Sequence, residues 1–176
     1  KKFNYMNTSN KIEPLLNIYN PADVKNYAML DFIISSDIFT HISPYPSLQL
    51  AFNNLYKMLK PGGHLIFSAP YNNNTKHIEH FPNLYKYKIS KINDKYVMYN
   101  LKKTGETERF DNLTFHSDTG KLLQMRVFSN KSIYSYLERS GFTDIVFHAI
   151  SEDMNRYGIF WESDASLIIT AKKPQS

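Results

Sequence analysis

The 176-residue chain contains no cysteine. A disulfide framework and a thiolate metal site are therefore excluded, and a reducing, cytoplasmic location fits that composition. No apolar run approaches the roughly 18 residues that a membrane-spanning helix requires, so we expect no membrane span. The six glycines never form a Gly-x-Gly pattern ahead of a helix. A glycine-rich loop of the kind that cradles phosphates or nucleotide cofactors is thus not visible in these residues.

The residues that are present are typical of a packed protein. Hydrophobic residues make up 42% of the chain and aromatic residues 15%, which predicts one folded domain over residues 1–176. The net charge of +5 is modest, and many basic residues fall between positions 83 and 110. They form either a basic patch for an anionic substrate or a solvated lysine-rich hairpin surface. No pattern of base-stacking aromatics accompanies them, so no nucleic-acid partner is expected.

Residues 30–71 predict a strand, a helix and a second strand. Residues 32–34 form a short apolar run, as in a parallel strand buried on both faces. Apolar residues then recur at helical spacing, at Leu48, Ala51, Phe52, Leu55 and Leu59. Pro61, Gly62 and Gly63 cannot continue that helix, so the chain turns into a strand over residues 64–69. Because a helix connects the two strands, we expect them to be parallel.

Two segments of this unit carry a family resemblance. The sequences DFIISSD (31–37) and YKMLKPGGHLIFS (56–68) resemble the second half of a class I S-adenosylmethionine-dependent methyltransferase of the type 11 kind. The resemblance implies a three-layer, Rossmann-like α/β sheet that is N-terminally incomplete here, because its first strands and glycine-rich loop are not recognisable. It also implies S-adenosylmethionine as the cofactor.

Residues 72–128 predict an antiparallel β-rich insertion within this domain. Strand-like segments at 86–90 and 96–101 flank a turn at Asn93 and Asp94, and a third segment covers 108–110. The sequences EHFPNLY (79–85), FDNLTFH (110–116) and MRVFS (125–129) resemble a methyltransferase subgroup associated with glycosyltransferase and surface-polysaccharide pathways. That resemblance implies a small-molecule or glycan acceptor.

The C-terminal part predicts a helix and two strands. Ser129 is suited to cap a helix over 131–140, which Gly141 ends. Strands are expected over 142–150 and 166–172. The resemblance implies that the last strand inserts between the strand over 64–69 and the strand over 142–150, and that it runs antiparallel to the latter.

Ligands of open α/β sheets bind beyond the carboxyl ends of the strands. This rule makes Ser36, Asp37 and Ile38 candidate cofactor contacts and places Tyr71 on the acceptor side. His41 lies just beyond the first strand end and is a candidate general base, although a histidine in such a loop is also commonly structural.

The acceptor side has further candidates. His80, Tyr85, His116 and Arg126 are expected to line it with Tyr71, and Arg126 is suited to hold a carboxylate or phosphate bidentately. The alternative is that Arg126 and His116 are satisfied within the insertion. The histidines and acidic residues of this region follow no compact metal-ligand spacing, so no metal site is expected.

The sequence therefore predicts methyl transfer from S-adenosylmethionine to a small-molecule or sugar-containing acceptor. A non-catalytic, methyltransferase-like scaffold or partner subunit is the alternative. We also expect these residues to bind the cofactor weakly, and to self-associate as a homo-oligomer through an exposed sheet edge.

Overall fold

A computed structural model describes residues 17–44, 48–72, 77–115, 123–148 and 166–175. Its main sheet has four strands in the order β1-β2-β10-β9: β1 (Leu30–Ser35), β2 (Leu59–Ser68), β10 (Ile168–Lys172) and β9 (Thr143–Phe147). β1 and β2 are parallel, as predicted. β10 runs antiparallel to both β2 and β9, which confirms the expected place of the last strand.

Two amphipathic helices cover one face of this sheet. α2 (Leu48–Met58) buries Ala51, Phe52 and Leu55, and α3 (Asn130–Ser140) buries Ile133 and Leu137. These side chains share a core with Leu65, Phe67, Ile169 and Ala171 of the sheet. α1 (Pro21–Asn26), which begins after the N-cap Asn20, packs beside α2 and adds Val24 to the same core.

The opposite face of β1 differs from the prediction. Phe32 and Ile34 are 59% and 58% exposed, so the strand is buried on one face instead of two. Ile33, which alternates with them, packs against the core. β1 is also an edge strand within the described part of the chain. Those residues thus form a two-layer arrangement with an uncovered strand face, and the third layer expected from the sequence is not seen among them.

The turn after α2 lies inside β2. Leu30 pairs with Leu59 and Phe32 pairs with His64, so the chain between Leu59 and His64 bulges out of the ladder. Gly63 sits where a Cβ atom would come within 2.9 Å of the Lys60 carbonyl oxygen. Glycine is needed here because the backbone passes so close to its neighbour.

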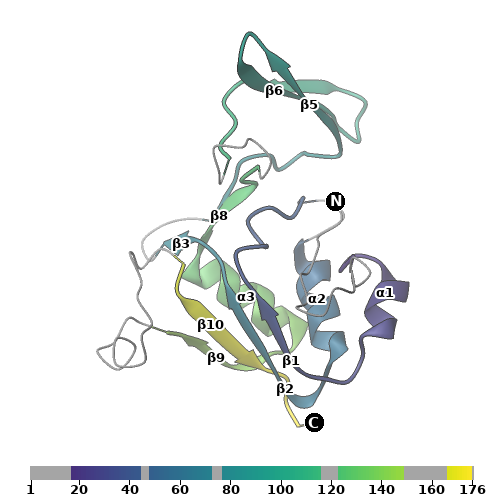
Figure 1. The fold of residues 1–176 in the computed structure, drawn as a ribbon, viewed down its shortest axis with the longest axis vertical. Coiled ribbons are helices and arrows are strands. Elements are labelled where there is room, and N and C mark those ends of the chain that lie inside the picture. The colour runs from purple at the N-terminus through teal and green to yellow at the C-terminus, as the bar shows by residue number, and fades with distance from the viewer. Residues whose placement is uncertain (1–16, 45–47, 73–76, 116–122, 149–165, 176) are drawn as a thin grey trace, which may run out of the picture.

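The insertion contains the predicted antiparallel sheet of β5 (Lys86–Ile92), β6 (Lys95–Leu101) and β7 (Thr107–Phe110). Asn93 and Asp94 both have positive φ, as a two-residue hairpin turn requires. Figure 1 shows this sheet at one end of the molecule, beyond β8 (Arg126–Ser129), which leads back to the main sheet. A small second core, built around Met98, Leu123 and Met125, holds the insertion together.

Two short strands tie the insertion to the main sheet. β3 (Tyr71–Asn72) pairs in parallel with β8, and β4 (Ile78–Glu79) pairs with β8 from the other side. α3 follows β8 directly. It has the predicted Ser129 cap, reinforced by Ser132, and ends at Gly141 with φ of 97°.

Candidate functional site

The carboxyl ends of β1 and β2 meet in a compact polar junction. The Asp37 backbone N–H donates to the Ser68 carbonyl oxygen at 3.1 Å, and the Ser68 hydroxyl donates to Asp37 Oδ1 at 3.0 Å. Ser36 Oγ lies 3.4 Å from Ser68 Oγ. The sequence prediction placed Ser36, Asp37 and Ile38 at this strand end, and they lie there.

Asp37 has a left-handed backbone conformation. Its φ is 48°, in the region that Asn and Asp adopt more readily than other residues apart from glycine. Here the two hydrogen bonds between Asp37 and Ser68 hold the turn, which aims the carboxylate across the ends of both strands.

His41 is held by the chain that returns from the insertion. Its Nδ1 lies 2.9 Å from the Leu123 carbonyl oxygen, which can only accept. Nδ1 must therefore carry the proton, and in the neutral ring Nε2 carries the lone pair. That tautomer is the one a base acting through Nε2 requires.

Arg126 is fully buried, and its charge is paired with that of Glu79. The guanidinium forms an ion pair with Glu79 through Nε, with a second contact from Nη2 at 3.3 Å, and donates from Nη1 to the Phe39 carbonyl oxygen. An acceptor anion would have to displace Glu79 to reach it. Of the alternative stated from the sequence, the part on Arg126 agrees with the Glu79 contact, although its second partner, Phe39, lies outside the insertion.

His77 extends this buried network toward α3. Its Nε2 lies 2.9 Å from Glu79 Oε1, and its Nδ1 lies 3.2 Å from Ser132 Oγ. Burial raises the pKa of Glu79, but hydrogen bonds from His77 and Arg126, together with their charges, outweigh burial and bring the pKa below its ordinary value. Glu79 is thus a carboxylate at neutral pH.

Tyr19 lies close enough to this network to sense its charges. Burial raises the pKa of its phenol to about 12, while the charges of Arg126 and Glu79 act in opposite directions. The hydroxyl donates to the Ser43 carbonyl oxygen at 3.1 Å. Tyr19 therefore remains neutral at physiological pH and does not supply a phenolate base.

The other predicted acceptor residues are dispersed. Tyr71 packs edge-on against Phe147 with ring centroids 5.5 Å apart, close to the end of β2. His80 donates its backbone N–H to Met125, and its buried Nε2 has no hydrogen-bond partner among the described residues. Tyr85 lies in the insertion, where its N–H donates to Asn100. His116 lies outside the described residues.

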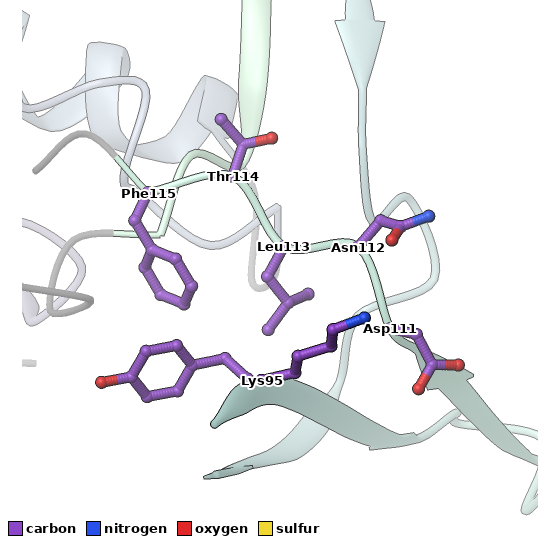
Figure 2. Close-up of a pocket in the computed structure, with 7 residues that line it drawn as sticks. Lys95, Asp111, Asn112, Leu113, Thr114 and Phe115 are labelled. Atoms are coloured by element: carbon purple, nitrogen blue, oxygen red, sulfur yellow. The ribbon is translucent and has the colours of Figure 1, made fainter. Parts of the chain in front are cut away.

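The insertion carries a pocket of its own, with a volume of about 320 Å³. Figure 2 shows Leu113 and Phe115 pointing toward Lys95, whereas Asn112 and Thr114 point the other way, as alternation along an extended segment requires. The pocket forms because the last β6–β7 pair is Met98 with Phe110, beyond which the chain leaves the sheet. Its lining mixes the apolar side chains of Leu113 and Phe115 with polar and charged ones, and Lys95 supplies the basic group.

Sequence reasoning did not identify Ser68 or Glu79 as partners of the predicted residues. Ser68 could have been found, because it ends a strand parallel to the one that Asp37 follows. Glu79 and Arg126 are separated by 47 positions, and no local pattern links them. Within the described parts of the chain, no group of three metal-ligating side chains is gathered for an ion, and no helix is long and apolar enough to span a membrane.

Comparison with known proteins gives similarity to solved structures. No family model matches the chain, and no curated protein sequence matches it. An S-adenosylmethionine-dependent methyltransferase from Clostridium acetobutylicum superposes with a TM-score of 0.47 and 18% identity, over 93% of this chain and 66% of that one.

Two further structures were solved with S-adenosylhomocysteine. The Burkholderia thailandensis 1,6-didemethyltoxoflavin-N1-methyltransferase gives a TM-score of 0.43 at 13% identity, over 84% of this chain and 45% of that one. The N-methyltransferase NodS from Bradyrhizobium japonicum gives 0.38 at 14%, over 84% and 47%. The chain thus spans less than two thirds of these proteins, to which it is structurally similar at low sequence identity.

Proposed function

We propose that this chain takes part in methyl transfer from S-adenosylmethionine to a small-molecule or sugar-containing acceptor. The observation that carries the proposal is the junction of Asp37 with Ser68 at the carboxyl ends of two adjacent parallel strands. That position is where open α/β sheets bind ligands. The sequence resemblance described above supports the choice of cofactor and adds acceptors of surface-polysaccharide pathways to the candidates.

In this proposal Ser36, Asp37 and Ile38 contact the cofactor. The Asp37 carboxylate is fixed through Oδ1 by Ser68, which leaves Oδ2 to accept a hydrogen bond from a hydroxyl of the cofactor. Ile38 supplies an apolar contact, since it is half-buried against the core.

Methyl transfer from a sulfonium is an in-line displacement that depends mainly on alignment. A hydroxyl or amine acceptor must also lose a proton, and we assign that role to His41 Nε2. The acceptor then lies on the side of Tyr71 and His80, whose buried Nε2 is suited to bond a polar group of the acceptor. Arg126 is bonded to Glu79 and Phe39 and is not assigned an acceptor contact.

A label-transfer assay tests the proposal. The protein is incubated with methyl-labelled S-adenosylmethionine and a panel of sugar, amine and hydroxy-acid acceptors. We expect transfer that His41→Ala reduces by about 10²-fold or more, the usual contribution of a general base. His64→Ala is the matched control, because His64 is exposed in the middle of β2 and lies away from the carboxyl end of the strand. Equal activity in the two variants would remove His41 from the mechanism.

The exposed apolar face of β1 favours a second candidate, a non-catalytic scaffold or partner subunit. Phe32 and Ile34 present a surface suited to another protein. The same assay separates the candidates, because a scaffold transfers no label to any acceptor while still binding a partner through β1.

A further inference from the structure

The segment 123–126, which returns from the insertion, fastens the loop after β1 with consecutive hydrogen bonds. The Met125 N–H donates to the Thr40 carbonyl oxygen at 2.7 Å. The Leu123 carbonyl accepts from His41 Nδ1 at 2.9 Å. Arg126 donates to the Phe39 carbonyl oxygen from the other end. We call residues 123–126 the strap.

The strap also belongs to the insertion. The Gln124 N–H donates to the Thr114 carbonyl oxygen at 2.8 Å, and Leu123 bridges to Phe115. Thr114 and Phe115 line the insertion pocket (Figure 2). One short segment therefore contacts both a wall of that pocket and the loop that carries His41.

Arg126 anchors the strap at its buried end. It is 0% exposed, and its planar guanidinium reaches Glu79 on β4 and Phe39 on the loop at once. The guanidinium places donors on three nitrogens in a fixed fork, whereas all the donors of lysine radiate from one nitrogen and cannot reach the two partners from separate positions. Glu79 is in turn held by His77, which rests on Ser132 of α3.

We propose that Arg126 is a positioning residue, which fixes the Phe39–His41 turn through the strap and so selects the Nδ1–H tautomer of His41. This inference deepens the proposed function, because its consequence for catalysis rests on His41 as the base. The side chain of Arg126 acts on the backbone that carries His41 and need not touch the acceptor.

The test is NMR of the ¹⁵N-labelled full chain, free of cofactor and acceptor. In the wild type we expect two well-separated ring-nitrogen resonances for His41 and slow exchange of the Met125 amide. In Arg126→Lys the ring resonances should converge toward those of a tautomer mixture. Met125 amide exchange should become about tenfold faster or more, as loss of one charged hydrogen bond predicts.

A second variant tests the same inference in case Arg126→Lys does not fold. Arg126→Met combined with Glu79→Gln removes both charges, so no uncompensated carboxylate remains, and the same changes at His41 and Met125 are expected. The matched control is Arg109→Met with Asp111→Asn, which removes an ion pair of the insertion that is exposed and does not contact the loop. We expect no change at His41 there.

The inference is overturned if either Arg126 variant is folded with the His41 tautomer and Met125 exchange of the wild type, or if the control changes them equally. These readouts require no turnover. A rigid strap in a protein that transfers no methyl group would therefore contradict the proposed function alone, and a loose strap in an active protein would contradict this inference alone.

Discussion

Arg126 and Glu79 form a buried ion pair, and both of its charges are largely shielded from water. Arg126 has no exposed surface and the Glu79 side chain is 20% exposed, so neither charge is well hydrated. Breaking such a pair on one side leaves the other charge uncompensated, whereas removing both charges is often nearly neutral. The pair therefore makes the packing between β4, β8 and the loop after β1 specific.

Single and double variants of this pair should differ in stability. We expect Arg126→Met to lower the free energy of unfolding by about 3 kcal/mol, because Glu79 is left without its main partner. Adding Glu79→Gln should recover at least about 1 kcal/mol of that loss. Urea unfolding monitored by circular dichroism measures both values. If the double variant lost as much free energy of unfolding as the two single variants together, the two side chains would not interact.

The lowered pKa of Glu79 predicts a pH dependence. A carboxyl whose pKa is lower in the folded state stabilises the fold above its unfolded pKa, about 4.3, and loses that contribution as pH falls through the folded value. The stability difference between wild type and Glu79→Gln should therefore shrink as pH falls below about 5. Urea unfolding across that range measures it, and a constant difference would contradict the assigned cause.

At the scale of elements, local signals were readable from the sequence. The Ser129 cap, the Gly141 stop and the Asn93–Asp94 turn are set by neighbouring residues, and each appears where expected. The two sides of α2 were less readable. Asn54, on its polar side, is 4% exposed and donates to the Ile18 carbonyl oxygen. Which side of a helix is covered depends on segments distant in sequence.

The exposure of one face of β1 could not be predicted either, because it also depends on segments distant in sequence. An all-apolar strand predicts cover on both faces, but the cover must come from elsewhere in the chain or from another molecule. Phe32 and Ile34 are each more than half exposed, although their sequence is that of a buried strand. The contacts of Arg126 could not be predicted for a related reason, since its partners Glu79 and Phe39 come from two segments distant from it in sequence.

The exposed side chains of β1 predict self-association. Apolar side chains exposed on an edge strand favour contact between copies. We expect a dimer or larger species, and expect Phe32→Lys with Ile34→Lys to convert it to a monomer with little change in stability. Tyr134→Lys is the control, since Tyr134 is similarly exposed on α3. Sedimentation velocity distinguishes the species, and a monomeric wild type would contradict the expectation.

At the scale of the whole molecule, a junction of strand ends is present without a recognisable glycine-rich loop. The family resemblance places most polar contacts to the methionine and ribose of the cofactor in that loop and its neighbouring strand. Losing two or three such hydrogen bonds, at about 1.5 kcal/mol each, weakens a micromolar site by two to three decades. Cofactor affinity in the millimolar range is therefore expected of these residues.

Titration of the ¹⁵N-labelled chain with S-adenosylhomocysteine, followed by amide chemical shifts, tests most directly whether the Asp37–Ser68 junction is a cofactor site. The account predicts saturable shifts at Ser36, Asp37 and Ile38 and at residues 68–71, with a Kd in the millimolar range that Asp37→Ala weakens further. Saturable shifts confined to the insertion, or none at these strand ends up to saturation of the solution with ligand, would contradict it.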